Sequence, residues 1–228
     1  MSTDAPGGVV GVVPAAGFAT RLQPLAGSKE ALRVGGRPLL AHLLERLWLG
    51  GCTRVIVTTR PAKRDVAAIA IEGGAEVVFA EPRSVAASIV AALRNVPDGD
   101  LAVIGFPDTV WEPADALRPV VRAARERDEV ILGLFPALDP TASDNVEVSR
   151  SGRVAAVVVK PERPRTRWTW GLAAARAHLL RGLEGCTEPG VFFDEAARAG
   201  RVSGLRFRGP YIDGGTNAGL SRLLNEAV

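Results

Sequence analysis

Apolar runs and amphipathic segments alternate along the first half of the chain. The run at residues 9–14 is rich in valine and carries no charge, which is typical of a strand buried on both faces of a sheet. Leucines at positions 39, 40, 43, 44 and 47 repeat with helical spacing. The pattern predicts strands at 9–14, 54–59, 76–79 and 100–104, and helices at 39–48, 63–71 and 85–93. This alternation indicates βαβ units and an α/β fold, with a Rossmann-like, mainly parallel sheet and helices on both faces.

The second half of the chain has a less regular pattern. Two apolar stretches flank a turn at residues 150–152 and predict a hairpin between strands 146–148 and 152–159. Residues 170–183 are predicted to be helical. The other predicted elements are helices at 113–127, 191–199 and 216–227 and strands at 129–134 and 202–207. Because no repeat or linker-like stretch divides the chain, we expect a single domain over residues 1–228, with residues 1–8 as a flexible leader.

A turn of small residues, the opening loop (residues 15–19), follows the first predicted strand. It reads Ala-Ala-Gly-Phe-Ala, and Arg21 and Lys29 come after it. Small residues let main-chain N–H groups approach phosphate oxygens, which bulky side chains would prevent. Arginine offers a planar fork for phosphate, and lysine supplies a mobile point charge. The opening loop therefore predicts a polyphosphate site, with a nucleoside triphosphate as the expected ligand.

Composition narrows the classes of function. The net charge is only +3, and the arginines are spread along the chain, so we expect no nucleic-acid binding. The two cysteines, Cys52 and Cys186, are expected to be unpaired thiols. The sequence has no signal-peptide pattern and no apolar run of membrane-spanning length, so we expect a cytoplasmic protein without membrane contact.

The opening loop and the residues after it resemble a nucleotidyltransferase signature. Residues 15–24 read AAGFATRLQP, and Ser28-Lys29 follows. This is similar to the pattern A-G-G-x-G-T-R-L-x-P, a short spacer and [P/S]-K of sugar-phosphate nucleotidyltransferases, such as the glucose-1-phosphate thymidylyl- and uridylyltransferases. The resemblance implies a glycosyltransferase-A-like nucleotidyltransferase fold with a small sugar-binding lobe. It places a nucleotide-binding half at about residues 9–112 and an acceptor-binding half at about 113–228.

The resemblance also implies an activity. Such enzymes couple a sugar 1-phosphate to an NTP with Mg²⁺ and release pyrophosphate and an NDP-sugar. Two cations, Arg21 and Lys29, would be the catalytic residues. The nucleotide-binding residues implied by the signature, with Glu81 from a later segment, are Ala15, Ala16, Gly17, Thr20 and Glu81. The partners expected are therefore an NTP and a sugar 1-phosphate, and a homo-oligomer is possible.

Two acids stand where a metal could be held. Asp108 follows a predicted buried strand, and Asp213 precedes the last predicted helix. A single aspartate before a turn commonly caps a helix or forms an Asx turn. Both positions match metal acids of the family, the second within its I-D-x-G-T motif, so the resemblance implies that Asp108 and Asp213 hold Mg²⁺.

A lysine is the candidate contact for the acceptor. Residues 152–161 are similar to the family segment G-x-V…E-K-P, in which the lysine contacts the sugar phosphate. The resemblance thus assigns Lys160 to the sugar phosphate, while the residues alone are equally consistent with a surface lysine. The glutamate of that motif is replaced by Val159, so we expect an acceptor unlike glucose 1-phosphate.

Other departures from the family pattern bear on the nucleotide. Ala19 replaces the last glycine of the signature and restricts positive φ, which is expected to weaken wrapping of the phosphates. Glu81 occupies the position of a base-reading glutamine. Because a carboxylate prefers donor groups, guanine with its N1–H and 2-amino group is a hypothesis for the base.

Two other functions remain open from the sequence. The stretches 12–18 and 36–40 are also similar to methylerythritol-phosphate cytidylyltransferases, which suggests a cytidylyltransferase acting on a polyol phosphate. Alternatively, Ala19 and Val159 are consistent with a catalytically degenerate homologue that binds a nucleotide as a regulator. The sequence leaves the base, the sugar and the pathway open.

Overall fold

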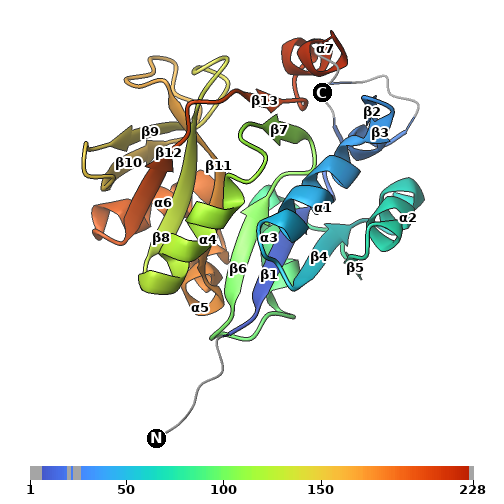
Figure 1. The fold of residues 1–228 in the computed structure, drawn as a ribbon, viewed down its shortest axis with the longest axis horizontal. Helices are drawn as coiled ribbons and strands as arrows, with labels where there is room; N and C mark the ends of the chain where they lie inside the picture. Colours follow the sequence, from blue (N-terminus) through green and yellow to red (C-terminus); the bar gives the residue numbers. More distant parts are fainter. Residues whose placement is uncertain (1–6, 20–21, 23–26, 226–228) are drawn as a thin grey trace, which may run out of the picture.

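The computed structural model describes residues 7–19, 22 and 27–225. Its centre is a seven-stranded sheet with the strand order β12-β8-β11-β6-β1-β4-β5 (Figure 1). The strands of this sheet are β1 (Val9–Pro14), β4 (Arg54–Thr59), β5 (Glu76–Phe79), β6 (Leu101–Gly105), β8 (Val130–Pro136), β11 (Trp168–Arg176) and β12 (Val202–Arg206).

Parallel pairing dominates this sheet. Strand β1 pairs in parallel with β4 on one side and with β6 on the other, and β5 extends the group beyond β4. Strands β8 and β12 form a second parallel pair. The predicted mainly parallel α/β architecture is therefore confirmed, and the predicted limits of β1, β4 and β5 agree with the structure.

The helix predicted over residues 170–183 is wrong. The first half of this stretch lies in β11, which runs antiparallel to β6 and β8 and joins the two parallel groups. Only Ala177–Leu180 (α5) is α-helical, and a 3-10 turn at Arg181–Leu183 (η3) follows it. Alanine favours a helix intrinsically, but β11 has seven consecutive buried residues. Burial between two strands overrides that local preference.

Helices cover both faces of the sheet (Figure 1), as the sequence predicts. Alternate residues of β1 point to opposite faces: Val9 and Val13 join one apolar cluster, whereas Val10 and Val12 join the other. The helices are α1 (Leu39–Leu49), α2 (Arg64–Glu72) and α4 (Leu117–Glu126) in the first cluster, with α3 (Val85–Leu93), α5 and α6 (Pro189–Arg198) in the second. Within the described ranges, none of the helices has the length and hydropathy to cross a bilayer.

Shorter elements surround the central sheet (Figure 1). Residues Thr109–Trp111 (β7) and Tyr211–Asp213 (β13) form an antiparallel pair that the sequence did not predict. The hairpin predicted around residues 150–152 is confirmed as β9 (Asn145–Val148) and β10 (Val154–Val158). The remaining elements are the 3-10 turn η2 (Lys29–Ala31), the β2 (Arg33–Val34) and β3 (Arg37–Pro38) hairpin, and α7 (Asn217–Asn225).

The two cysteines are free thiols, as predicted. Cys52 lies in the apolar cluster under α1, and burial raises the pKa of its thiol to about 12. Because the thiolate is the reactive form of cysteine, Cys52 is held in its inert state.

Gly171 in β11 lies against Tyr211, so its size should matter for stability. A Cβ added at Gly171 would approach Tyr211 Cε2 to 2.3 Å. We expect Gly171→Ala to lower the free energy of unfolding by about 1–3 kcal/mol through overpacking. Gly99→Ala is the matched control, because its added Cβ meets no atom within 4 Å. Urea denaturation of both variants measures the difference, and equal stabilities would contradict the packing argument.

Candidate active site

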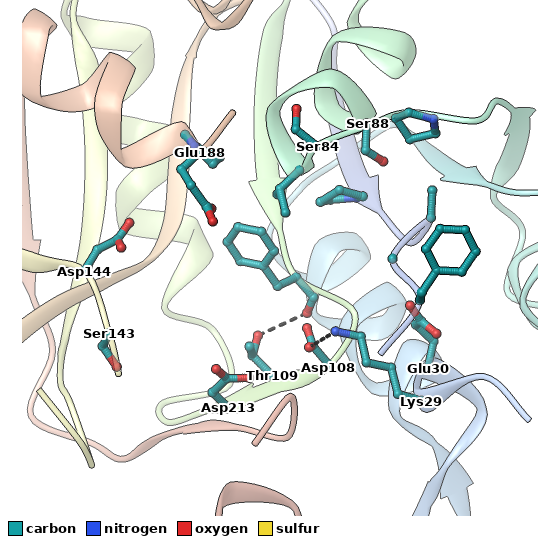
Figure 2. Close-up of a pocket in the computed structure, with 18 of the residues that line it drawn as sticks. Lys29, Glu30, Ser84, Ser88, Asp108, Thr109, Ser143, Asp144, Glu188 and Asp213 are labelled. Atoms are coloured by element: carbon teal, nitrogen blue, oxygen red, sulfur yellow. Dashed lines mark hydrogen bonds and ion pairs between the residues drawn. The ribbon is translucent and has the colours of Figure 1, made fainter. Parts of the chain in front are cut away.

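A pocket of about 680 Å³ lies beyond the carboxyl ends of the parallel strands, where open α/β sheets bind ligands. Figure 2 shows Lys29 and Glu30 on one side of it and Asp144 and Glu188 on the other. Of the residues predicted to form a site, those lining the pocket are Ala16, Gly17, Lys29, Glu81, Asp108, Lys160 and Asp213. Ala15 is fully buried in the same loop. Thr20 and Arg21 lie outside the described residues.

The opening loop leaves β1 with its first peptide anchored to the sheet, because the Ala15 N–H donates to the carbonyl oxygen of Thr58 at 2.8 Å. Gly17 faces open space, since an added Cβ there would meet no atom within 4 Å. Ala19 adopts a φ of +52°, in the left-handed region. Ala19 therefore keeps a left-handed backbone although it is not glycine. This conformation costs an L-residue about 1–2 kcal/mol.

Lys29 and Asp108 form a nearly buried ion pair. Lys29 Nζ lies 2.5 Å from Asp108 Oδ2, and the two side chains are 16% and 10% exposed. Burial alone would lower the pKa of Lys29, but the charge of Asp108 and its hydrogen bond, with Glu30 and Asp213 adding, raise it above its ordinary value. Lys29 is therefore a permanent ammonium in this pocket at neutral pH.

The β7–β13 pairing brings the two predicted metal acids together. Asp213 lies opposite Thr109, the residue after Asp108, and the Gly214 N–H donates to the Asp108 carbonyl oxygen at 2.8 Å. The Gly215 N–H donates to Asp213 Oδ1 at 2.7 Å, which orients that carboxylate. Both aspartates line the pocket, so residues 105 positions apart in the sequence share one wall.

A mixed-charge group forms the far side of the pocket. Lys160 is exposed and pairs with Glu188 at 3.1 Å, and its backbone has a φ of +40°. Asp144 accepts a hydrogen bond from Trp170 Nε1 at 2.8 Å. Burial raises the pKa of Asp144 above its ordinary value, although Trp170 and Lys160 oppose this. Trp170 is 6% exposed and lines the pocket.

Helix α3 supplies the third side of the pocket. Ser84 caps this helix by accepting from the Ala87 N–H at 3.1 Å, and the Ser88 hydroxyl is buried without a hydrogen-bond partner among the described residues. Glu81 is exposed at the same rim. The segment predicted to read the base therefore does border the pocket.

A model of the MobA-like NTP transferase domain matches residues 11–188 of the sequence. This range includes the opening loop, Lys29, Asp108 and Lys160. The chain belongs to this family. The predicted membership in the nucleotidyltransferases is thereby confirmed.

Two curated proteins give a measure of similarity. The NTP transferase domain is 26% identical to the bifunctional protein GlmU of Parvibaculum lavamentivorans over 218 residues, which cover 90% of this chain and 47% of that protein. It is 24% identical to a glucose-1-phosphate thymidylyltransferase of Xanthomonas campestris pv. campestris over 168 residues, with 69% and 56% covered. The chain spans about half the length of these relatives.

Solved structures share the fold. A Bacillus anthracis protein assigned to the glucose-1-phosphate thymidylyltransferases and solved with sucrose matches with a TM-score of 0.85 at 17% identity, covering 96% of this chain and 95% of that one. A UDP-glucose pyrophosphorylase from Acinetobacter baumannii matches with a TM-score of 0.81 at 15% identity, covering 96% and 92%. The predicted fold class is that of these nucleotidyltransferases.

Several polar residues of the NTP transferase domain's pocket escaped the sequence analysis. They are Glu30, Arg60, Ser84, Ser88, Asp144 and Glu188, with Lys63 immediately behind the opening loop. One signal in the composition does point to Lys63: only three of the 28 Lys and Arg residues are lysines. Two of them, Lys29 and Lys160, line the pocket, and the third contacts its loop. In a chain that otherwise uses arginine, each remaining lysine marks the site.

The left-handed conformation of Ala19 makes a prediction about stability. Ala19→Gly removes the Cβ penalty, although glycine also gains freedom in the unfolded chain. We expect the free energy of unfolding to rise by about 0.5–1 kcal/mol. Ala80→Gly is the control, because Ala80 is not among the positive-φ residues. Its free energy of unfolding should fall by a similar amount. Urea denaturation gives both values, and a loss in Ala19→Gly like that of the control would contradict the strain.

The Lys29–Asp108 pair makes a prediction about pH. Because the folded-state pKa of Lys29 is raised, its contribution is fully present below the unfolded pKa and is lost as pH rises through the folded value. The stability difference between the wild type and Lys29→Met should be constant from about pH 6 to 9 and shrink above about pH 10.5. Denaturation at several pH values measures it. A difference that shrinks below pH 9 would show that Lys29 titrates early.

Proposed function

We propose that this chain couples a sugar 1-phosphate to a nucleoside triphosphate, releasing pyrophosphate and an NDP-sugar. The observation that carries the proposal is the shared pocket of the opening loop, the Lys29 ammonium, and the two carboxylates Asp108 and Asp213. Its volume of about 680 Å³ is within the range of small-molecule sites. The names of the relatives, a thymidylyltransferase among them, support the same reaction type.

The reaction needs positioning more than a base. An oxygen of the sugar phosphate is already an anion; it forms a bond to the α-phosphorus while the bond to the β-phosphate oxygen breaks, and pyrophosphate leaves with the electron pair. Lys29 would hold the two repelling anions together and neutralise the charge of the transition state. Arg21 is proposed to hold the leaving phosphates, and Ala16 and Gly17 to offer them backbone N–H groups.

The carboxylate pair fits a magnesium ion. Mg²⁺ commonly takes one or two protein carboxylates and completes its octahedron with water and substrate phosphates. Asp108 and Asp213 supply such a pair, and no group of three or more His, Cys, Asp or Glu side chains suited to a metal occurs in the described part of the chain. When bound, Mg²⁺ would neutralise charge on the phosphate oxygens. Lys29 pairs with Asp108 in this structure, so the ammonium lies beside one of the carboxylates that would hold the ion.

The acceptor would lie on the far side of the pocket. Lys160 is proposed to contact its phosphate, with Glu188 as the lysine's present partner. Val159 cannot hydrogen-bond sugar hydroxyls as a glutamate could, whereas Asp144 offers a carboxylate on the same side. This arrangement supports an acceptor that differs from glucose 1-phosphate in its polar groups.

A matrix of NTPs against sugar 1-phosphates, read by pyrophosphate release with Mg²⁺, tests the proposal. We expect at least one pair to turn over. Lys29→Met should lower kcat about 100- to 1,000-fold, because it removes the ammonium that would neutralise the charge of the reacting phosphates. Asp213→Asn should lower the affinity for Mg²⁺, read from the dependence of the rate on Mg²⁺ concentration, by at least about tenfold.

Asp128→Asn, an exposed carboxylate away from the pocket, is the matched control and should keep wild-type kinetics. Folding of each variant is checked by its thermal midpoint. Turnover with CTP and a polyol phosphate alone would replace the proposed reaction with the cytidylyltransferase alternative. Nucleotide binding without pyrophosphate release from any pair would favour the regulatory homologue.

A further inference from the structure

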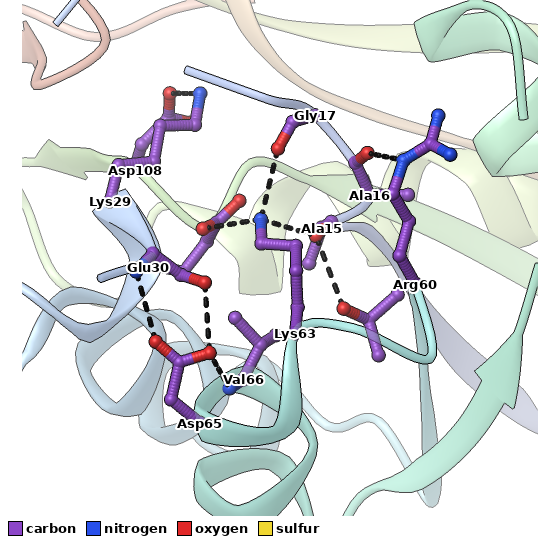
Figure 3. A network of polar contacts seen from close by, with 12 residues as sticks. Ala15, Ala16, Gly17, Lys29, Glu30, Arg60, Lys63, Asp65, Val66 and Asp108 are labelled. Carbon is purple, nitrogen blue, oxygen red and sulfur yellow. Dashed lines mark hydrogen bonds and ion pairs between the residues drawn. The ribbon is translucent and has the colours of Figure 1, made fainter. Parts of the chain in front are cut away.

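The connection between β4 and α2 makes a set of polar contacts with the opening loop. This connection and the first turn of α2, residues 60–65, read Arg-Pro-Ala-Lys-Arg-Asp and are called the clamp segment below. Figure 3 shows Arg60 and Lys63 reaching the loop from one side, while Asp65 lies beside the chain near Glu30. Sequence reasoning gave this segment no role, and the proposed chemistry does not use it.

Lys63 donates to three acceptors at once. Its Nζ lies 2.9 Å from the Ala15 carbonyl oxygen, 3.1 Å from that of Gly17 and 2.7 Å from Glu30 Oε2. An ammonium has three donors on one compact centre, which suits three acceptors arranged around a single point. The geometry explains why lysine stands here in a chain dominated by arginine.

Arg60 holds the carbonyl between those two. Its Nε donates to the Ala16 carbonyl oxygen at 2.8 Å, and its Nη2 donates to that of Pro82 at 2.7 Å. The guanidinium also lies 4.1 Å from the centre of the Phe18 ring, within cation–π range. Arg60 thus joins the opening loop to the rim of the pocket that precedes α3.

Three successive carbonyl groups of the opening loop are therefore held by cations. In a trans peptide the C=O and the next N–H point in opposite directions. Fixing the carbonyls of Ala15, Ala16 and Gly17 also fixes the directions of the next three N–H groups. These belong to Ala16, Gly17 and Phe18, which are residues that line the pocket. The carbonyl oxygens, which would repel phosphate, are turned toward the cations.

The clamp segment also holds the chain around Lys29. Ser28 donates to Asp65 twice, from its N–H at 2.9 Å and from its hydroxyl at 2.8 Å, and Asp65 accepts from the Val66 N–H. Glu30 follows Lys29 directly and pairs with Lys63. One segment thus contacts both the opening loop and the residues on either side of Lys29.

The Lys63–Glu30 pair is costly for stability alone. The two side chains are 12% and 1% exposed, and burial raises the pKa of Glu30 despite the attraction of Lys63 and Lys29. Glu30 Oε1 has no hydrogen-bond partner among the described residues. Replacing such a buried pair by apolar side chains is often neutral or stabilising, so stability does not account for its presence.

We propose that Arg60, Lys63 and Glu30 are positioning residues that preorganise the opening loop and Lys29 for a triphosphate. This inference rests on the proposed function. Lys63 and Arg60 orient the loop amides, and Glu30 balances the charge of Lys63 and keeps it in place. None of the three has to touch the reacting atoms.

The decisive variant replaces both partners, Lys63→Met with Glu30→Met. We expect unchanged or higher stability, because the buried charges are removed together, but a KM and a Kd for the NTP that are about 10- to 100-fold higher. The KM of the acceptor should stay near the wild-type value. Calorimetric titration with NTP and Mg²⁺ gives the Kd without turnover. The control is Arg54→Met with Glu76→Met, an exposed bidentate pair on the same sheet, which should bind like the wild type.

Two single variants keep the test independent of that double variant. Arg60→Lys preserves the charge but cannot bond both carbonyls, so NTP affinity should fall. Lys63→Arg should also lower NTP affinity, since the donors of its planar fork do not lie on one atom as those of the ammonium do. Wild-type NTP affinity in folded Lys63→Met/Glu30→Met and Arg60→Lys proteins would overturn the inference alone. NTP binding without turnover by the wild type would contradict only the proposed function, and no NTP binding at all would overturn both.

Discussion

The ion pair between Lys29 and Asp108 is the interaction on which this site depends. It joins the chain after the opening loop to the end of β6, 79 positions later, and it does so where burial makes each unpaired charge expensive. The β7–β13 pairing then sets Asp213 beside Asp108. The Lys29 ammonium thereby has carboxylates near it in a pocket whose ligand is expected to be an anion. It therefore has a negatively charged partner both before and after the ligand binds.

Much of the first half could be predicted because its elements have regular local patterns. Strand β1 is continuous valine and glycine, and α1 carries leucines at helical spacing, so both follow from periodicity. Strand β11 could not be found this way, because its alanines favour a helix and only its place between β6 and β8 makes it a strand. Strands β7 and β13 are three residues each, too short for any period to appear.

The residues of the site likewise fall into those that the sequence predicts and those that it does not. Lys29, Asp108 and Asp213 stand in motifs with fixed neighbours, and the structure brings them into one pocket. Arg60, Lys63 and Glu30 belong to no motif, and in the sequence each resembles an ordinary solvated charge. Their importance arises from contacts across 22 to 48 positions, which no local pattern encodes. The scarcity of lysine is a compositional trace of that geometry, because an ammonium carries three donors on a single atom.

Several local rules fail around the opening loop, in keeping with the role proposed for it. Ala19 has a left-handed backbone, Glu30 Oε1 has no hydrogen-bond partner in the described part of the chain, and the Lys63 side chain is only 12% exposed. Each feature costs free energy that a loop selected for stability alone would avoid. Their common effect is to fix amide directions and one ammonium in advance, which lowers the cost of ordering the loop when an anion binds. A rigid, strained loop held by buried charges is thus a physical alternative to the glycine-rich loop that wraps its ligand.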